Sequence, residues 1–234
     1  MGMKSGVNII CLYWVGDYRG RDYKPQDIVN LRATVDKWID RPYKFYCLTN
    51  RPDADIPAIK IPFRNNWPGW WAKVELFRPD LPKGRTLYLD TDTYIVNNLQ
   101  PILDYDGNLV MFDSREPKKR WSRAPVQGWV YRYQAATMLF NPGALSWVYF
   151  KFKNDPEAYM NTYRGEQDMY GIWIPNQPTF PQEWMLKLDA VKVHKKIRRD
   201  TIIVTGQPKG TEWRDPHKYA PWLIKKARGI EVCT

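Results

Sequence analysis

The sequence is poor in cysteine and has no long hydrophobic run. Its three cysteines, Cys11, Cys47 and Cys233, form no CxxC pair, and their odd number leaves one without a disulfide partner. A disulfide scaffold and a zinc ribbon are therefore excluded, and a reducing, cytoplasmic location is expected. No apolar run approaches the ~18–20 residues that a membrane-spanning helix needs. The apolar stretch near the N-terminus continues into Gly16-Asp17 without a small-residue cleavage site, so it predicts a first strand rather than a signal peptide.

Several common functional motifs are also missing. The chain has two histidines and no nucleophile-elbow pattern, which disfavours a Ser/His hydrolase. It has no Walker-type glycine loop, which argues against a P-loop kinase. No helix-turn-helix, zinc-finger or RNP motif is present, so no standard nucleic-acid-binding module is identified.

Acidic residues are scarce in the second half of the chain. Residues 1–117 carry sixteen basic and fifteen acidic side chains, whereas residues 118–234 carry twenty basic and ten acidic side chains. Most of the net charge of +11 therefore lies in the second half of the chain. The excess is concentrated at 118–123 (KKRWSR), 192–199 (KVHKKIRR) and 225–228 (KKAR). This asymmetry indicates an anionic partner: nucleic acid, an acidic glycan or lipid headgroups. The alternative is a solvated basic surface that only keeps the protein soluble.

The pattern of apolar residues predicts a single α/β domain spanning residues 1–234. Strand and helix signals alternate over the first hundred residues, which favours a sheet with at least some parallel strands. The predicted strands cover residues 7–13, 43–48, 56–61, 86–89, 108–112, 135–140 and 202–205, and the predicted helices cover residues 26–40, 70–77 and 144–152. Ligands of such sheets bind beyond the carboxyl ends of the strands.

A pair of carboxylates follows one of these predicted strands. Residues 86–96 read TLYLDTDTYIV, so an apolar strand delivers Asp90 and Asp92 one residue apart. In extended geometry both side chains project to the same side, where they repel each other unless a cation or a proton lies between them. Mn²⁺ or Mg²⁺ takes such oxygen ligands and can bridge carboxylates to nucleotide phosphates. The alternative is a solvated turn in which Asp90 or Asp92 caps the following segment.

This segment resembles the DxD site of GT-A glycosyltransferases, particularly the glycosyltransferase family 8 and glycogenin-like group. Further pieces are similar to that group in the same order, over about residues 7–213. The segments NIICLYW at 8–14 and YKFYCLTN at 43–50 look like its first two strands, and GWWAKVELF at 69–77 looks like the segment before the DxD strand. YQAATMLFN at 133–141 resembles the strand near the donor sugar, and RGEQD at 164–168 resembles a motif that opens a helix. VTGQPKGTEW at 204–213 looks like the element that closes over the diphosphate.

The resemblance implies a single GT-A domain with a central mixed, mostly parallel sheet flanked by helices. It also implies a nucleotide-diphosphate sugar as donor, with UDP as the expected nucleotide, and a bound Mn²⁺ or Mg²⁺. Asp92 is the expected principal metal ligand, and Asp90 contacts the metal or the ribose. The residues expected at the donor are Tyr13, Trp14, Lys73, Asp90, Thr91, Gly206 and Lys209. Tyr13 or Trp14 stacks on the base, and Lys73 is placed to approach phosphate or the DxD carboxylates. Lys73 and Lys209 are the candidates that stabilise the diphosphate, unless they are solvated surface charges.

Some positions depart from the family pattern. Thr205 stands where the group usually has a histidine as third metal ligand, so either water completes the metal shell or binding is weaker. His194 and His217 are the histidines that could take its place. On the sugar-binding strand, Gln134 and Ala136 replace the usual Asn and Gly, which alters the expected sugar pocket.

Transfer to a hydroxyl needs either a general base or a same-face route in which the leaving phosphate takes the proton. The resemblance favours the second route, with retention of configuration. Glu166 and Asp168 are the candidate base or sugar-positioning groups, and Gln134 is the third candidate catalytic residue. The alternative for Glu166 is that it only favours a helix N-terminus.

The charge asymmetry divides the expected domain into a nucleotide-sugar-binding half (about 1–117) and a basic, acceptor-binding half (about 118–234). The expected acceptor is anionic. One candidate is a hydroxylated base in DNA, as for viral enzymes of related type, which would place the protein in the host cytoplasm. The other is a glycan or lipid-linked sugar, with peripheral membrane contact. A nucleotidyltransferase, a nuclease or a non-catalytic nucleic-acid-binding module are the alternatives from other classes.

Overall fold

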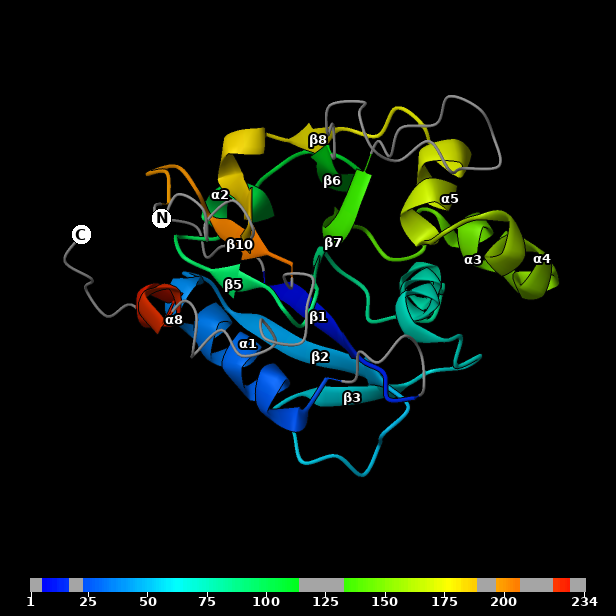
Figure 1. The fold of residues 1–234 in the computed structure, drawn as a ribbon, viewed down its shortest axis with the longest axis horizontal. Helices are drawn as coiled ribbons and strands as arrows, with labels where there is room; N and C mark the ends of the chain where they lie inside the picture. The colour runs from blue at the N-terminus through cyan, green and yellow to red at the C-terminus, as the bar shows by residue number, and fades with distance from the viewer. Residues whose placement is uncertain (1–5, 17–22, 114–132, 189–196, 207–220, 228–234) are drawn as a thin grey trace.

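The computed structural model describes residues 6–16, 23–113, 133–188, 197–206 and 221–227, and a seven-stranded sheet forms its centre (Figure 1). The strand order is β3-β2-β1-β4-β7-β6-β8. Neighbouring strands are parallel except at β7, which runs antiparallel to both β4 and β6. The strands are β1 (Val7–Tyr13), β2 (Tyr43–Thr49), β3 (Ile59–Pro62), β4 (Thr86–Leu89), β6 (Leu109–Asp113), β7 (Tyr133–Phe140) and β8 (Thr179–Phe180).

Burial of β1 on both faces explains its uninterrupted apolar sequence. All seven residues of VNIICLY are buried, as is usual for a parallel strand covered on both sides. Because side chains alternate along a strand, Ile9 and Cys11 pack into one hydrophobic cluster, whereas Ile10 and Leu12 pack into another. The sheet therefore separates two cores.

One core lies between the sheet and the helices α1 (Pro25–Trp38) and α2 (Gln100–Leu103). Helix α1 begins where Pro25 occupies a first-turn position and the Asp27 carboxylate accepts a hydrogen bond from the Lys24 N–H at 2.7 Å. Ile28, Leu31 and Val35 recur at helical spacing and are buried against the sheet.

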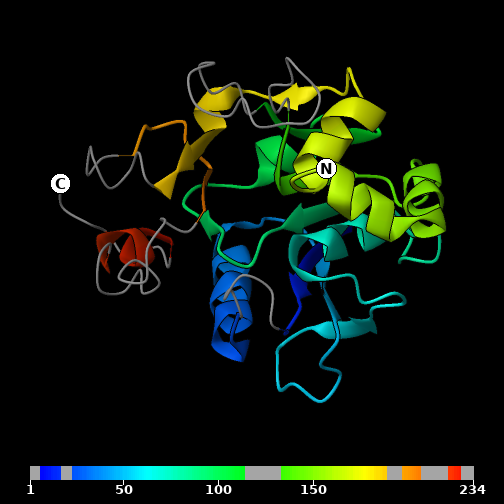
Figure 2. The same ribbon diagram turned by 45° about the vertical axis from the view of Figure 1, so that its right-hand side comes forward.

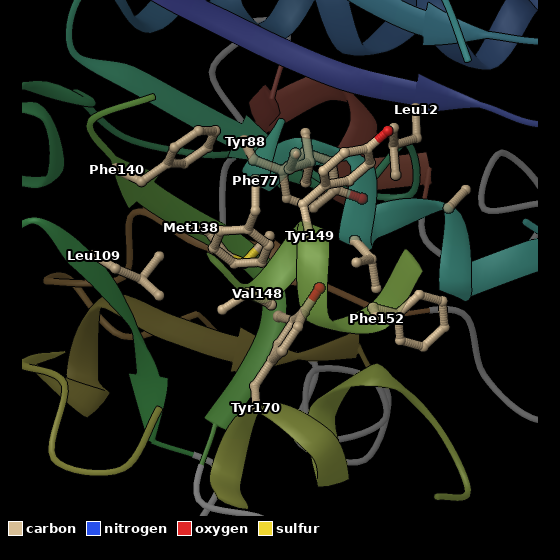
Figure 3. Packing of buried hydrophobic residues seen from close by; sticks show 14 of the residues in the cluster. Leu12, Phe77, Tyr88, Leu109, Met138, Phe140, Val148, Tyr149, Phe152 and Tyr170 are labelled. Carbon is tan, nitrogen blue, oxygen red and sulfur yellow. The ribbon is translucent and has the colours of Figure 1, made fainter. Parts of the chain in front are cut away.

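The other core lies beneath η1 (Gly69–Phe77), α3 (Ser146–Asn154) and α5 (Glu166–Trp173), with α4 (Pro156–Thr162) beside them (Figures 1 and 2). Figure 3 shows its side chains meeting from strands and helices alike. The labelled residues are Leu12, Phe77, Tyr88, Leu109, Met138, Phe140, Val148, Tyr149, Phe152 and Tyr170. Many aromatic rings contribute to this core, several of them in edge-to-face pairs such as Trp67 with Phe152 and Phe77 with Tyr170.

A smaller sheet, β5-β10-β9, joins the chain just after β4 to a much later segment. It consists of β5 (Tyr94–Ile95), β10 (Ile203–Thr205) and β9 (Met185–Lys187), the last preceded by η2 (Gln182–Trp184). The short helix α8 (Pro221–Ala227) lies near β5 in both views, and Leu223 packs into the cluster that contains Val96 and Val204 (Figures 1 and 2). The late segment therefore comes close to the end of β4.

Most predicted strands are confirmed, and the differences have local causes. The predicted strand over 56–61 begins only at Ile59, because the Ala58 N–H donates to the Ile56 carbonyl and turns the chain at Pro57. The predicted helix over 70–77 is present as a 3₁₀ helix. The short strands β5, β8 and β9 and helix α4 were not predicted. Within the described residues, no helix combines the length and apolar character that a membrane crossing requires.

Candidate active site

The carboxyl ends of β1, β2 and β4 meet at one edge of the sheet, because these strands are parallel neighbours. Strand β4 ends at Leu89, and a turn follows in which the Thr93 N–H donates to the Asp90 carbonyl at 3.0 Å. The Asp90 N–H donates to the Ala136 carbonyl of β7 at 2.8 Å. The predicted extended geometry of Asp90-Thr91-Asp92 is therefore wrong: this hydrogen-bonded turn replaces the alternating strand geometry at the carboxylate pair.

A buried lysine joins this turn to helix α5. Lys73 Nζ lies 2.9 Å from Asp90 Oδ1 and 3.1 Å from Glu166 Oε1. The Lys73 and Glu166 side chains are 9% and 4% exposed, and that of Asp90 is 19% exposed. The Tyr88 hydroxyl donates a further hydrogen bond to Asp90 Oδ1. One ammonium thus lies between two carboxylates that come from segments far apart in the sequence.

Burial and mutual attraction set the charges of this cluster. Burial lowers the pKa of Lys73, but attraction to Asp90 and Glu166 outweighs it, so the pKa is raised and the amine is charged at neutral pH. Burial raises the pKa of Glu166, with Asp90 adding to the rise and Lys73 opposing it. Burial and the nearby Asp90 also raise the pKa of Tyr88, which therefore donates as a neutral phenol. Because Lys73 is the ammonium that pairs with both acids, its loss would leave two carboxylates uncompensated, whereas loss of either acid leaves Lys73 with the other one.

Three hydrogen bonds fix the strand ends around the cluster. The Thr91 hydroxyl donates to the Leu12 carbonyl at 2.7 Å, which ties the turn after β4 to the end of β1. The Val15 N–H donates to Asn50 Oδ1 at 3.0 Å, and Asn50 Nδ2 donates back to the Val15 carbonyl at 2.8 Å. The three strand ends therefore form one connected rim.

The two aromatic candidates for base stacking differ in exposure. Tyr13 is only 6% exposed and belongs to the core beneath α1. Trp14 is half-buried, and its Nε1 donates to Asn66 Oδ1 at 3.0 Å. A Cβ atom at Gly16 would lie 2.3 Å from the Trp14 ring, so glycine is needed for this ring position. Trp14 is accordingly the residue that presents an oriented ring at the rim.

A second buried carboxylate holds the segment that contacts Trp14. Glu75 is fully buried and accepts from three successive backbone N–H groups, those of residues 64, 65 and 66, at 2.7, 2.8 and 3.1 Å. Arg78 donates to Glu75 at 2.9 Å and to the Pro62 carbonyl at 2.9 Å. Asn66 itself has a φ of 51°, in the left-handed region. This cluster fixes the backbone of Asn66 and, through it, the Trp14 indole.

The remaining candidates on β7 and α5 lie in partly buried surroundings. Arg164 Nε donates to Asp168 Oδ2 at 3.1 Å, and burial raises the pKa of Asp168 while Arg164 opposes that rise. Gln134 is half-buried on β7, next to the β-bulge between Met111 and Phe112. Its Oε1 is buried and accepts no hydrogen bond from the described residues. Such an acceptor suits a ligand hydroxyl.

The segment 204–213, which was predicted to close over the diphosphate, is described only at its beginning. Thr205 ends β10 and is fully buried. Gly206 follows with a φ of 97°, in the left-handed region that glycine adopts without strain. Lys209, His194 and His217 lie outside the described residues, as does the basic segment at 118–123.

The carboxylates at this rim fit a hard divalent ion in their chemistry. Asp90 and Asp92 offer only oxygen atoms, which Mg²⁺ and Mn²⁺ prefer. Among the residues described, no group of three His, Cys, Asp or Glu side chains is placed to hold a metal ion. An ion held by the two aspartates therefore needs further ligands, and phosphate oxygens or water can supply them. Thr205, in place of a histidine, brings no nitrogen ligand.

Solved structures of glycosyltransferases match this chain over nearly its whole length. The galactosyltransferase LgtC, in complex with donor and acceptor sugar analogues, has a TM-score of 0.61 and 14% identity, covering 97% of each chain. The chain has the GT-A glycosyltransferase fold. An active-site mutant of LgtC gives a TM-score of 0.62 at 14% identity with the same coverage. The glycosyltransferase GlyE of Streptococcus pneumoniae TIGR4 gives 0.61 at 13%, covering 97% of this chain and 63% of its own.

The GT-A fold class predicted from the sequence is thus confirmed at very low sequence identity. No protein-family model matches the chain, and a search of curated proteins also finds no match. The structure brings together three of the predicted site residues, Lys73, Asp90 and Glu166. Asp168 instead pairs with Arg164.

Three residues that help build the site were missed by the sequence analysis: Tyr88, Asn66 and Glu75. A signal existed for Glu75, because a carboxylate within the otherwise apolar segment VELF has to be paired if that segment is buried. Asn66 carries no such signal, since its contact with Trp14 joins segments distant in the sequence. Tyr88 contacts Asp90 only two residues later, but a tyrosine within an apolar strand does not by itself indicate that its hydroxyl binds a carboxylate.

Proposed function

We propose that the protein is a glycosyltransferase that moves a sugar from a nucleotide-diphosphate sugar to a hydroxyl group of an acceptor. The GT-A fold supports this assignment. The observation that carries it is the buried Lys73 between Asp90 and Glu166, at the rim where α/β sheets bind their ligands. A buried charge cluster costs stability unless it is fully paired, and such clusters occur preferentially at functional sites.

The turn after β4 holds the diphosphate end of the donor in this proposal. Asp90 and Asp92 would hold Mn²⁺ or Mg²⁺, with oxygen atoms of the donor among the other ligands. A bound ion supplies positive charge to the departing diphosphate. Lys73 holds the Asp90 carboxylate in one orientation, since its ammonium contacts both carboxylate oxygens, at 2.9 and 3.0 Å. Lys209 is the candidate for a further contact to the diphosphate.

The donor base and the sugar are assigned to neighbouring parts of the rim. Trp14 stacks on the base, oriented by Asn66. Gln134 Oε1 accepts a hydrogen bond from a sugar hydroxyl, which satisfies an acceptor that is otherwise buried without a partner among the described residues. Thr91 is assigned to positioning, because its hydroxyl donates to Leu12.

The burial of Glu166 bears on the route of the acceptor proton. Glu166 is 4% exposed and contacts Lys73, so an acceptor hydroxyl cannot reach it without breaking the ion pair. Asp168 is 10% exposed and paired with Arg164. We therefore assign Glu166 to positioning Lys73 and favour the retaining route, in which the leaving phosphate accepts the proton. Asp168 is the alternative base if the reaction inverts.

The acceptor is assigned from charge. The net charge of +11 favours an anionic molecule, and a hydroxylated base in DNA remains the first prediction. A glycan or lipid-linked sugar is the alternative. Activity on DNA should fall steeply as the salt concentration rises, whereas transfer to a neutral glycan should not.

A thermal-shift panel tests the donor class directly. Nucleoside diphosphates and nucleotide sugars are added one at a time, each with and without Mn²⁺. A ligand at about one hundred times its Kd stabilises the folded state by about 2.7 kcal/mol, which corresponds to a rise in Tm of roughly 5–10 °C for a chain of this size. The expected result is stabilisation by one nucleoside diphosphate, and by its sugar conjugates, only when Mn²⁺ is present.

Matched variants separate specific binding from a general charge effect. Asp92→Asn should abolish the metal-dependent shift. Asp53→Asn removes an exposed carboxylate that is paired with Arg51, and it should leave the shift unchanged. Product analysis decides between enzyme classes, because glycosyl transfer releases a nucleoside diphosphate whereas nucleotidyl transfer releases pyrophosphate. If Asp90→Asn/Asp92→Asn protein binds the donor as well as the native protein does, the proposal is wrong.

A further inference from the structure

The exposed side of helix α3 is unusual in composition. Among the described residues, the large hydrophobic side chains that are exposed are Val29, Ile59, Trp147 and Phe150. Two of these four, Trp147 and Phe150, lie within one turn of α3, at 42% and 50% exposure. Residues three apart are neighbours on a helix surface, so the two rings form one apolar patch.

The same side of α3 carries positive charge beside the rings. Lys151 and Lys153 are exposed, and α3 contains no acidic residue. Lys151 Nζ lies 4.3 Å from the centre of the Trp173 ring and 6.0 Å from that of Trp147. The Lys151 ammonium therefore lies over the Trp173 ring in a cation–π contact, which places positive charge directly beside the aromatic patch.

The patch rests on a rigid base. Val148, Tyr149 and Phe152, on the opposite side of α3, are buried in the aromatic core. Trp147 packs against Trp173 at the end of α5, with ring centres 6.3 Å apart. Figures 1 and 2 both place α3 and α4 at the margin of the molecule, away from α1. Core packing explains one side of α3 but gives no reason for exposed Trp and Phe on the other.

We infer that this side of α3, defined by Trp147, Phe150, Lys151 and Lys153, docks the protein on an anionic lipid surface. Exposed Trp and Phe beside Lys, on a helix with a buried opposite face, is the composition of helices that lie in the headgroup region of a bilayer. The lysines complement anionic headgroups, and the rings enter the boundary with the acyl chains. The inference stands apart from the proposed function, since docking requires no glycosyl transfer.

A sugar or a nucleic-acid base is a less suitable occupant. The Trp173 ring has Lys151 over it and Tyr159 edge-on at 4.8 Å, so it offers no open stacking platform. Phe150, the more exposed ring, carries no hydrogen-bonding group. Both features favour an apolar phase bordered by negative charge over a ligand that needs directional polar contacts.

Vesicle flotation tests the inference with the full-length protein. Native protein should float with vesicles of phosphatidylcholine containing about one third phosphatidylglycerol, and much less with phosphatidylcholine alone. Phe150→Ser should lower the partition coefficient about tenfold, because the inserted ring is lost. Ile59→Ser is the matched control: Ile59 is 52% exposed on β3, and its replacement should leave partitioning unchanged.

Charge variants provide the second readout. Lys151→Gln/Lys153→Gln should weaken partitioning to anionic vesicles about fivefold per lysine and reduce its dependence on salt. Lys225→Gln/Lys226→Gln removes two exposed lysines of α8 and should have the smaller effect. The Tm of every variant is measured, so that a loss of binding is not mistaken for unfolding.

Three results would overturn the inference. The first is that native protein fails to float with anionic vesicles. The second is that Phe150→Ser floats as well as native protein does, which would place any membrane contact elsewhere. The third is that Phe150→Ser leaves flotation intact but lowers affinity for single-stranded oligonucleotides or oligosaccharides, which would make the patch a stacking surface.

Discussion

The short helix η1 carries two buried charge clusters that differ in how they are completed. Glu75 accepts from three backbone N–H groups and from Arg78, so both of its carboxylate oxygens are satisfied within the protein. Lys73, two residues earlier, holds Asp90 and Glu166, whose carboxylates outnumber it. One cluster is closed by the backbone, whereas the other leaves negative charge at the partly exposed Asp90. A buried cluster whose polar atoms are all paired within the protein therefore belongs to the structural framework. A buried cluster with excess negative charge at a strand end is instead a candidate ligand-binding site.

The largest effect is expected from Lys73→Met. Without the ammonium, Asp90 and Glu166 are buried with no counter-charge, which should lower the free energy of unfolding by about 3–5 kcal/mol at pH 8. The pKa of Glu166, which burial already raises, would then lose the opposing effect of Lys73 and rise further, so the destabilisation should be smaller at pH 5, where this carboxylate can take up a proton. Urea unfolding at the two pH values measures this. If the unfolding free energy falls equally at the two pH values, the effect comes from the lost packing of the lysine side chain rather than from charge.

The closed cluster should respond differently when its carboxylate is replaced. Glu75→Gln turns one acceptor oxygen into a donor that faces backbone N–H groups, and we expect a loss of about 2–4 kcal/mol in unfolding free energy. Transfer per folded molecule should stay within about threefold of native, measured at a temperature where the variant is fully folded. A large loss of kcat in this variant, without loss of fold, would remove the distinction between the two clusters.

Glu166→Gln removes one carboxylate charge from the Lys73 cluster and leaves the ammonium in place. Lys73 keeps Asp90 as a partner, so the stability loss should be only about 1–2 kcal/mol, while kcat should fall at least tenfold. Because burial raises the pKa of Glu166 in the native protein, its stabilising contribution is present at low pH and declines as pH rises through that pKa. The stability difference between native and variant should therefore shrink from pH 5 to pH 8. A difference that grows with pH would contradict this.

The smallest effect is expected at Asn66, which joins the Glu75 cluster to the Trp14 indole. Asn66→Gly keeps the left-handed backbone but removes the acceptor for Trp14 Nε1. Stability should change by less than about 1 kcal/mol, and the Kd for the nucleoside diphosphate should rise about three- to fivefold, the worth of one partly exposed hydrogen bond. Asn176→Gly, at the other described asparagine with positive φ, is the matched control and should leave the Kd unchanged. Calorimetric titration measures both.

Helix and strand positions were predictable wherever one apolar pattern covered the whole element. The buried strand Val7–Tyr13 and the amphipathic helix at Pro25–Trp38 are examples, because burial on two faces or on one leaves a direct trace in the sequence. Two- and three-residue strands such as β5 and β9 leave no such trace. Their existence depends on pairing with β10, about one hundred residues from β5.

The candidate site was predictable in its residue types but not in its connections. The position of Asp90 at a strand end is a local property of TLYLD, and the structure confirms where the strand stops. The contact of Lys73 with Glu166 spans more than ninety residues and forms only when η1 and α5 pack on the same side of the sheet. The role of Gln134 and the ligation by Asp92 stay predictions, which donor binding will test.

By itself, the sequence determined the α/β class, the positions of the main strands and the carboxylates at the end of one of them, because each follows from the order of neighbouring residues. Tertiary structure alone decided that the carboxylate segment is a turn, that Lys73 is shared by two acids, and that Glu75 belongs to the framework. The physical reason is that burial and charge pairing are properties of segments brought together by packing, and no local pattern encodes which distant partner a charged side chain will meet.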